Sequence, residues 1–238
     1  MIMFDFNSVA YRHLLNNILK YKADENSHGI EYELLNAKQS FDVDSYIDCA
    51  ITKYIEAELD WYLSQDLCIA GHKLIETNKV WSNICSDGRI VNSNYGWCIF
   101  SKANGNQYEN VVKHLMDDKS TKHACMYYTR PAIHREYNDN KHAKYDMICT
   151  IYTNHFIRHN KLFTTVHMRS SDAWNGVRND HAWHIYVYNK LYAKLTTKYA
   201  DLKKGNITFI ADSMHIYKRD VDKVYKYLNE AQEAADEQ

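Results

Sequence analysis

A possible nucleophile, a fixed cation and a possible reader of a ring's polar edge follow one another closely in the second half of the chain. Cys149 lies in a strand-like run, and residues 169–172 (Arg-Ser-Ser-Asp), Gly176 and residues 178–180 (Arg-Asn-Asp) come after it. A cysteine thiolate is the best nucleophile among the side chains, and a neighbouring guanidinium lowers the pKa of the thiol and can bind a phosphate through two parallel hydrogen bonds. The combination suits attack on an electron-poor ligand.

Packing in the core is the alternative for this cysteine as long as spacing is the only guide, because free cysteines are among the most buried residues. The six cysteines are scattered and contain no CxxC pair, which indicates reduced thiols rather than a zinc ribbon or a disulfide scaffold. His181 and His184 have helical spacing, but this pair alone does not make a metal site, so we expect none.

The composition favours a small ligand over a polymer or a membrane. The chain has 238 residues, 45% of them hydrophobic, and a formal net charge of -1, which argues against nucleic acid or an anionic membrane as the main partner. No run approaches the roughly 20 apolar residues that span a bilayer, and no signal peptide opens the chain. We expect a single domain over residues 1–238 in the cytoplasm.

Helices and strands that could position these residues can be predicted from the pattern of apolar positions. Helical spacing predicts helices over residues 10–19, 46–63, 107–116, 180–199 and from 220 into the acidic end. Runs rich in β-branched and aromatic residues predict strands over 31–35, 125–128, 147–157, 162–168 and 206–211, with a hairpin turn at 159–161.

The expected fold class is α+β (mixed α/β), with a predominantly antiparallel or mixed sheet covered by helices on one face. In this arrangement Cys149 would lie on a strand. Residues 169–172 would begin the loop that follows the hairpin and leads into the long fourth helix.

The order of the motifs resembles the thymidylate synthase family. Cys149, Arg169-Ser170-x-Asp172 with Gly176, a polar residue at 180 and His215-x-Tyr217 carry the resemblance. Upstream, Glu58-Leu59-x-Trp61-Tyr62, Trp81 and Tyr95-Gly96 match the family's helix motif, its folate-side tryptophan and its tyrosine–glycine pair. The resemblance implies the thymidylate-synthase fold and a homodimer formed through one face of the sheet.

Within the family, four segments are more similar to the deoxycytidylate hydroxymethylases of bacteriophages. These segments are residues 92–97 (Asn-Ser-Asn-Tyr-Gly-Trp), 128–131 (Tyr-Thr-Arg-Pro), 147–150 (Met-Ile-Cys-Thr) and 178–180 (Arg-Asn-Asp). A viral source, and hence the cytoplasm of a host cell, is what this likeness implies.

The resemblance implies a catalytic group of Cys149, Glu58, Arg169 and Tyr95. Cys149 would add to C6 of a pyrimidine, so that C5 can attack the one-carbon unit of 5,10-methylenetetrahydrofolate, the expected cosubstrate. Arg169 would hold the nucleotide phosphate and favour the thiolate. Glu58 would order water and move protons near C5, although a solvated helix edge is its alternative.

Other positions are implied to bind the two substrates. Ser170 would donate to the phosphate, and His215 and Tyr217 would hydrogen-bond the sugar 3'-hydroxyl. On the folate side, Asp172 would accept from the pterin, Trp81 would pack against it, and Gly176 would allow a close backbone approach. For Trp81, Tyr95 and Tyr217, packing in the core is the alternative.

Position 180 discriminates between bases. An asparagine there suits uracil in the synthases, whereas an aspartate can accept from the N4 amino group of cytosine and share a proton with N3. Asp180 therefore favours cytosine. A helix N-cap is the alternative role for this residue.

Two absences favour water over hydride as the last reactant. Ile84 stands where the synthases have a second tryptophan, and residues 228–238 lack the apolar tail that closes the synthase site. An active site that admits water does not suppress hydrolysis, so an exocyclic methylene on the ring would become hydroxymethyl. A merely divergent tail is the alternative.

Two departures concern the phosphate. Residues 24–29 contain no arginine or lysine, unlike the synthase phosphate loop, and Lys122-His123 stand where the partner subunit lends two arginines. Lysine and histidine give up the forked geometry of arginine. Lys122 and His123 are thus predicted substrate ligands, with surface solvation as their alternative.

The prediction is therefore folate-dependent hydroxymethylation of a cytidine monophosphate, dCMP above all. The alternatives are C5 methylation of dCMP, hydroxymethylation of dUMP, and a catalytically silent nucleotide-binding protein that keeps the fold.

Overall fold

The computed structural model describes residues 6–26, 29–77, 80–85, 89–138 and 146–236. The strands are β1 (Asp24–Asn26), β2 (Gly29–Phe41), β3 (Cys125–Tyr127), β4 (Thr150–Arg158), β5 (Lys161–Asp172) and β6 (Lys203–Tyr217). The helices are α1 (Phe6–Leu19), α2 (Thr52–Ser64), α3 (Leu74–Thr77), α4 (Val80–Ile84), α5 (Tyr95–Phe100), α6 (Gln107–Asp117), α7 (Ile133–Asn138), α8 (Val177–Thr196) and α9 (Val221–Asp236). Short 3-10 turns at Lys102–Asn104 and Lys218–Asp220 join them.

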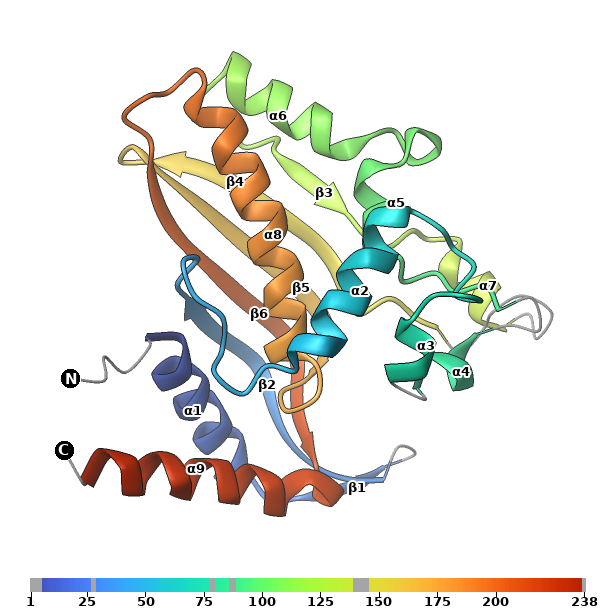
Figure 1. Ribbon diagram of the computed structural model, residues 1–238, viewed down its shortest axis with the longest axis vertical. Helices are drawn as coiled ribbons and strands as arrows, with labels where there is room; N and C mark the ends of the chain where they lie inside the picture. The colour runs from blue at the N-terminus through green and yellow to red at the C-terminus, as the bar shows by residue number, and fades with distance from the viewer. Residues whose placement is uncertain (1–5, 27–28, 78–79, 86–88, 139–145, 237–238) are drawn as a thin grey trace.

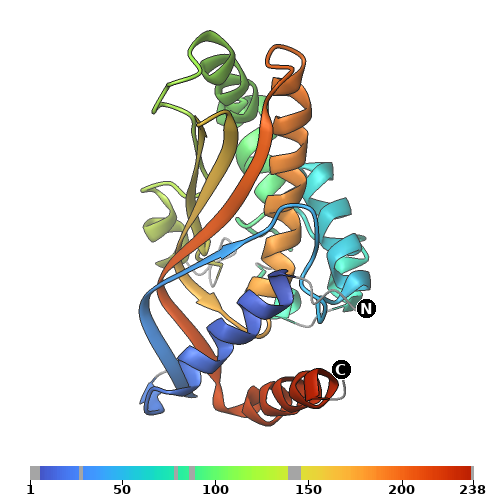
Figure 2. The same cartoon turned by 90° about the vertical axis from the view of Figure 1, so that its left-hand side faces the viewer.

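One mixed sheet organises the fold. Its strand order is β1-β2-β6-β5-β4-β3, and every neighbouring pair is antiparallel except β5 and β6, which run parallel (Figure 1). A parallel pair needs a crossover, and α8 supplies it. Figure 2 shows α8 and α2 on one side of the sheet. The predicted α+β class with a mixed sheet is confirmed, and α8 and α2 cover one face of that sheet (Figure 2).

Alternation along β5 separates the two faces of the sheet. Leu162, Thr164, Val166 and Met168 are buried toward the helices, whereas the residues between them are only half-buried. The core forms between this face and α8, where Trp183, Tyr188 and Leu191 have almost no exposed surface.

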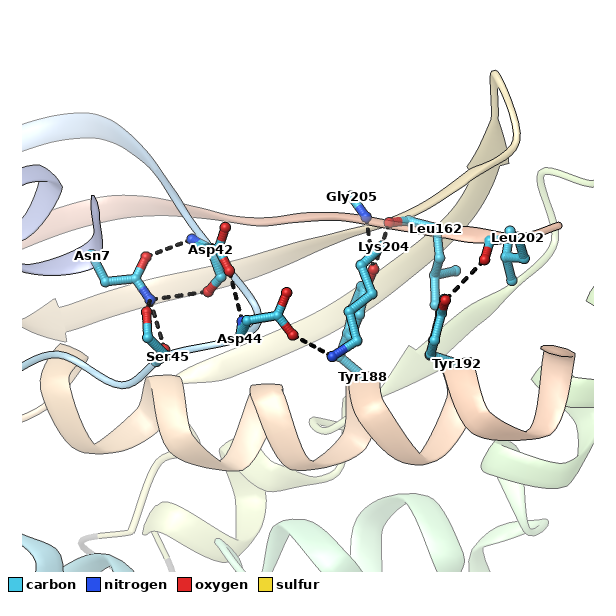
Figure 3. Close-up of polar contacts among 10 residues, drawn as sticks. All are labelled: Asn7, Asp42, Asp44, Ser45, Leu162, Tyr188, Tyr192, Leu202, Lys204 and Gly205. Atoms are coloured by element: carbon cyan, nitrogen blue, oxygen red, sulfur yellow. Dashed lines mark hydrogen bonds and ion pairs between the residues drawn. The ribbon is translucent and has the colours of Figure 1, made fainter. Parts of the chain in front are cut away.

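Tyrosine hydroxyls fasten α8 to the strand ends (Figure 3). Tyr188 donates to the Leu162 carbonyl over 2.8 Å and accepts from the Gly205 amide over 2.9 Å, while Tyr192 donates to the Leu202 carbonyl over 2.8 Å. Buried hydroxyls of this kind are stable only when hydrogen-bonded, so the contacts fix the long helix along the sheet.

The predicted hairpin is present, with a tighter turn. Arg158 pairs with Lys161, and the two residues between them, His159 and Asn160, have φ of 50° and 60°. Two consecutive left-handed residues form the type of turn that matches the twist of an antiparallel hairpin.

Three local expectations were wrong. The helix expected from residue 46 begins at Thr52, and Cys149 lies one residue before β4 rather than on a strand. Arg169 to Asp172 form the end of β5, not a loop, because β6 continues beside them and pairs Ser170 with Ser213 and Asp172 with His215.

The N-cap role of Asp180 was also wrong. Helix α8 begins at Val177 with Gly176 as its N-cap residue, which makes Asp180 the fourth helical residue. Its side chain is therefore available to the interior of the site rather than committed to the helix end.

A close approach between α2 and α5 requires glycine at position 96. A Cβ atom there would lie 1.7 Å from the Tyr62 carbonyl oxygen, so any side chain would force the two helices apart. This explains the Tyr95-Gly96 pair as a packing motif that brings Tyr95 against α2. Within the described residues, none of the helices combines the length and the apolar character needed to cross a membrane.

Candidate active site

Cys149 and Arg169 lie together at the open end of the β4–β5 hairpin. The Arg169 amide donates to the Cys149 carbonyl over 3.0 Å, and a guanidinium nitrogen of Arg169 lies 3.7 Å from the thiol sulfur. The same guanidinium donates to the carbonyls of Met147 and Ile148 over 2.6 and 3.2 Å. Arg169 thus fixes the segment that presents the thiol while remaining exposed itself.

The thiol is protonated in this environment at neutral pH. Burial raises the pKa of Cys149 to about 11, Arg169 lowers it, and Asp180 and Asp146 raise it further. Arg169 thus acts on the thiol pKa in the predicted direction, but burial outweighs it. Attack by Cys149 therefore requires that its proton be taken up or that further positive charge enter the site.

Two carboxyl groups from different helices, the buried Glu58 and the half-buried Asp180, lie close enough to affect each other's ionisation. Glu58 of α2 is 5% exposed, and burial together with Asp180 of α8 raises the pKa of Glu58 to about 8. Burial and the nearby Asp172 raise the pKa of Asp180 to about 7. Groups with pKa values near neutrality can both hold and release a proton at physiological pH, as general acids and bases must. The alternative that Glu58 is a solvated edge residue was wrong.

Tyr54 joins Glu58 to the tryptophan of α4. Its hydroxyl donates to Glu58 Oε1 over 2.7 Å, and the Trp81 indole nitrogen donates to that hydroxyl over 3.1 Å. The sequence prediction missed Tyr54. Its position one helical turn before Glu58 is the signal that could have found it.

Tyr95 lies between α2 and the strand that follows the nucleophile. Its ring stacks on that of Tyr62 with centroids 5.0 Å apart, and its hydroxyl accepts a hydrogen bond of 3.0 Å from Thr150. Burial, Asp180 and Cys149 together raise the pKa of Tyr95, so the phenol stays protonated.

Asp146 was also missed, and it anchors the segment before Cys149. Its carboxylate accepts from the amides of Asn92 and Ser93 over 2.5 and 2.8 Å and from the Ser93 hydroxyl. Arg130 reaches the same group of residues, since it donates to Asn92 Oδ1 over 2.9 Å. The motifs at 92–97 and 128–131 therefore meet beside the nucleophile.

The predicted sugar-binding residues lie on β6, next to the end of β5. The rings of His215 and Tyr217 meet edge to face with centroids 4.9 Å apart, and Arg219 lies 4.0 Å over the Tyr217 ring. His215 Nδ1 is buried and has no hydrogen-bond partner in the described structure. An unpartnered buried nitrogen of this kind is suited to a ligand hydroxyl.

The predicted folate-side residues lie around the turn before α8 and on α4. Asp172 Oδ1 accepts from the amides of Trp174 and Asn175, both over 2.9 Å, which holds the turn before α8. A Cβ atom at Gly176 would lie 2.8 Å from the Asp172 carbonyl oxygen, so the tight turn needs glycine. Trp81 is 7% exposed and packs edge to face on Trp61.

Two predicted ligands lie away from this group within the chain. Lys122 and His123 precede β3, near Arg158 at the far end of β4, where Arg158 reaches the Thr121 carbonyl over 3.5 Å. A nine-residue strand is about 30 Å long, so the same chain does not bring them to Cys149. Lys122 instead lines a hollow of about 610 Å³ on the face of the sheet opposite α8, and this hollow is separate from the catalytic group.

The two histidines with helical spacing belong to the core. His181 packs against Phe41 and His184 against Phe209, and burial lowers the pKa of both imidazoles to about 4 and 3. Among the described residues, no group of three or more histidine, cysteine, aspartate or glutamate side chains could hold a metal ion.

The chain was also compared with known protein families and with individual proteins. A family model described as thymidylate synthase matches residues 10–237, which is nearly the whole chain. The chain belongs to the thymidylate synthase family. Membership confirms the predicted fold class and supports folate-dependent one-carbon transfer to a pyrimidine nucleotide. The family uses 5,10-methylenetetrahydrofolate as its cosubstrate.

Similar proteins come from three phages. The deoxycytidylate 5-hydroxymethyltransferases of Enterobacteria phages T4 and T2 are each 37% identical to this chain over 169 residues, which is 70% of this chain and 68% of theirs. The enzyme of the same name from Enterobacteria phage T6 is 37% identical over 172 residues, with the same coverage. The predicted likeness to the hydroxymethylase branch of the family is confirmed.

Proposed function

We propose that this protein transfers a hydroxymethyl group from 5,10-methylenetetrahydrofolate to C5 of dCMP. The observation that carries the proposal is Asp180, a carboxyl group with a pKa of about 7 that lies beside Glu58, Tyr95 and Cys149. Such a carboxyl can accept from the cytosine N4 amino group and share its proton with N3. An ionised carboxylate would instead repel uracil O4.

The catalytic group divides the work on the ring. Cys149 loses its proton and its sulfur bonds to C6, which gives C5 the electron density to form a bond to a carbon electrophile. Folate supplies that carbon. Arg169 holds the nucleotide phosphate and lowers the thiol pKa, Ser170 adds a second phosphate contact, and Glu58 moves protons near C5.

The fate of the new carbon depends on what reaches it. The C5 proton then leaves and the bond from the new carbon to the folate nitrogen breaks, which releases tetrahydrofolate and leaves an exocyclic methylene on the ring. Water adds to that methylene carbon, and the C6–sulfur bond breaks to restore Cys149. Ile84, at the end of α4 and half-buried, stands where the synthases have a second tryptophan. A smaller side chain at this position supports access for water.

A homodimer is part of the proposal. Alternation along β5 puts Arg169 on the same side as Thr165 and His167, the side of the sheet that lacks α8 and contains the 610 Å³ hollow. Lys122 and Arg158 line this hollow, and Tyr127 at its edge strand is 57% exposed. A second copy packed on this face would bring its own Lys122 and His123 toward the phosphate held by Arg169.

The proposal also assigns residues to the sugar and to the folate. His215 and Tyr217 hydrogen-bond the sugar 3'-hydroxyl, and the buried, unpartnered His215 Nδ1 supports this role. Asp172, Gly176 and Trp81 line the folate side.

Release of tritium from C5 tests the proposal. Purified protein is incubated with 5,10-methylenetetrahydrofolate and with dCMP, CMP or dUMP tritiated at C5, and tritium appearing in water is counted. We expect fastest release from dCMP and release from dUMP slower on the order of a hundredfold, since the base is read at Asp180. Fastest release from dUMP would contradict the base assignment, and no release from all three would support the catalytically silent alternative.

A further inference from the structure

A hydrogen-bonded series of three side chains connects Trp81 on α4 with Glu58 on α2. Trp81 on α4 donates to the Tyr54 hydroxyl over 3.1 Å, and that hydroxyl donates to Glu58 Oε1 over 2.7 Å. The direction of the series is fixed, because an indole nitrogen can only donate and the tyrosine hydroxyl then has its own proton left for the carboxyl group.

Glu58 depends on such donors. Tyr54 and Tyr62 face it from its own helix, and Asp180 faces it from α8. Tyr95 from α5 stacks on Tyr62. Among the described residues no lysine, arginine or histidine pairs with Glu58, so neutral hydroxyls take the place of a cation. A buried carboxyl group that lost its donors would be left unsatisfied at a cost in free energy, so these donors favour the position in which they reach it.

The hydroxyl of Tyr54 keeps its proton. Burial and the nearby Glu58 raise the pKa of Tyr54 well above its usual value, so that it is a donor throughout the working range of pH. Tyr54 itself lies on α2 one turn from Glu58, while Trp81 is 7% exposed and wedged against Trp61. Two different helices, α2 and α4, therefore carry the ends of this hydrogen-bonded series.

We propose that Tyr54 is a positioning residue that fixes the Glu58 carboxyl for proton transfer and ties it to Trp81. This inference rests on the proposed function, in which Glu58 moves protons near C5 and Trp81 borders the folate. Tyr54 acts through Glu58, so its hydroxyl should matter for the chemical step and not for binding of the nucleotide.

Tyr54→Phe removes the hydroxyl and leaves the ring. We expect kcat with dCMP to fall roughly tenfold to a hundredfold, because a misplaced proton-transfer group slows the chemical step, while KM for dCMP stays within about twofold. The hydrogen bond from Tyr54 lowers the pKa of Glu58. Its loss should therefore move the ionisation of Glu58, and the limb of the rate profile that follows it, to higher pH.

Tyr192→Phe is the matched control. It too removes a hydroxyl that donates to an oxygen over a similar distance, 2.8 Å to the Leu202 carbonyl, but near the far end of α8 (Figure 3). Its kcat and rate profile should match those of the wild-type protein. An equal loss of kcat in both variants would reduce the role of Tyr54 to general stability and overturn the proposal.

Two spectroscopic readouts need no turnover. The carboxyl ¹³C resonance of Glu58, assigned with Glu58→Gln, should titrate at higher pH in Tyr54→Phe, and the indole ¹⁵N–H resonance of Trp81, assigned with Trp81→Phe, should shift. Trp81→Phe breaks the series at its other end and should also move the Glu58 resonance, which keeps the test open if Tyr54→Phe does not fold.

The outcomes separate the two claims. If wild-type protein releases no tritium from any nucleotide, the proposed function fails, and the two resonances still decide whether Tyr54 positions Glu58. Resonances of Glu58 and Trp81 that stay unmoved in Tyr54→Phe, together with wild-type kcat, would overturn the inference about Tyr54 alone.

Discussion

Replacing Cys149 by alanine is expected to abolish tritium release from C5 of dCMP, with a loss on the order of 10⁴-fold or more. The reason is that the sulfur forms the bond to C6 on which every later step depends, and no neighbouring group can replace it. Cys149 is the cysteine that lies 3.7 Å from the Arg169 guanidinium. The measurement is the rate of tritium release at saturating dCMP and methylenetetrahydrofolate.

Cys68→Ala is the matched control for this experiment. Cys68 is also a half-buried cysteine, but it lies after α2 in a segment that pairs with Ile90 rather than at the open end of the β4–β5 hairpin. We expect this variant to retain wild-type release, and Cys149→Ala to retain dCMP binding by calorimetry, since Arg169 and Ser170 remain. Substantial release by Cys149→Ala would show that the covalent step is wrong.

Asp180→Asn is expected to move base preference from cytosine toward uracil. The amide cannot share a proton with N3 as the carboxyl does, and it removes the carboxylate that repels uracil O4 while offering O4 a donor. We expect the ratio of kcat/KM for dCMP over dUMP to fall on the order of a hundredfold, since a site built for one hydrogen-bonding pattern rejects another strongly. Tritium release from both nucleotides, over a range of concentrations, gives the ratio.

Asp222→Asn makes the same chemical change in a comparable helical position. Asp222 lies in the first turn of α9 and is exposed, whereas Asp180 lies in the first turn of α8 and faces Glu58. The control should keep the wild-type ratio of dCMP to dUMP. If Asp180→Asn keeps it as well, cytosine is read by another group.

Local sequence patterns predicted the elements whose neighbours along the chain also pack together. The β4–β5 hairpin was predictable because buried and half-buried residues alternate along both of its strands. Helix α6 was predictable because its buried residues recur at helical spacing within the helix itself. Motif order then identified the residues of the site, and the family comparison confirmed the family. Glu58, Tyr95, Cys149 and Asp180 come from α2, α5, the segment before β4 and α8, and the fold brings them together.

Pairing between strands that are distant in the sequence set the ends of β2, β5 and β6, which local patterns did not predict. The predicted strand ended at Ala211 because the polar residues Asp212 and Ser213 follow. β6 nevertheless continues through them, because β2 and β5 pair with it on both sides. In β2, Asn36 at φ 54° interrupts the alternation on which a strand prediction depends. The pairing of β5 with β6 likewise extends β5 through Asp172.

Hydrogen bonds between a side chain and the backbone of a distant segment could not be predicted from the sequence either. Arg169 donates hydrogen bonds to the carbonyls of Met147 and Ile148. Asp146 accepts hydrogen bonds from the amides of Asn92 and Ser93. Neither contact follows from spacing, since the partners come from separate segments. Tyr54 differs, because its distance of one helical turn from Glu58 was visible in the sequence.

The identity of the product in heavy-oxygen water tests the central claim most directly. Wild-type protein is given dCMP and 5,10-methylenetetrahydrofolate in H₂¹⁸O, and the nucleotide is analysed by mass spectrometry. Addition of water to the exocyclic methylene predicts a dCMP derivative that carries one hydroxymethyl group with its oxygen labelled, and a folate product left at the tetrahydro level. A methylated, unlabelled nucleotide together with dihydrofolate would contradict the account.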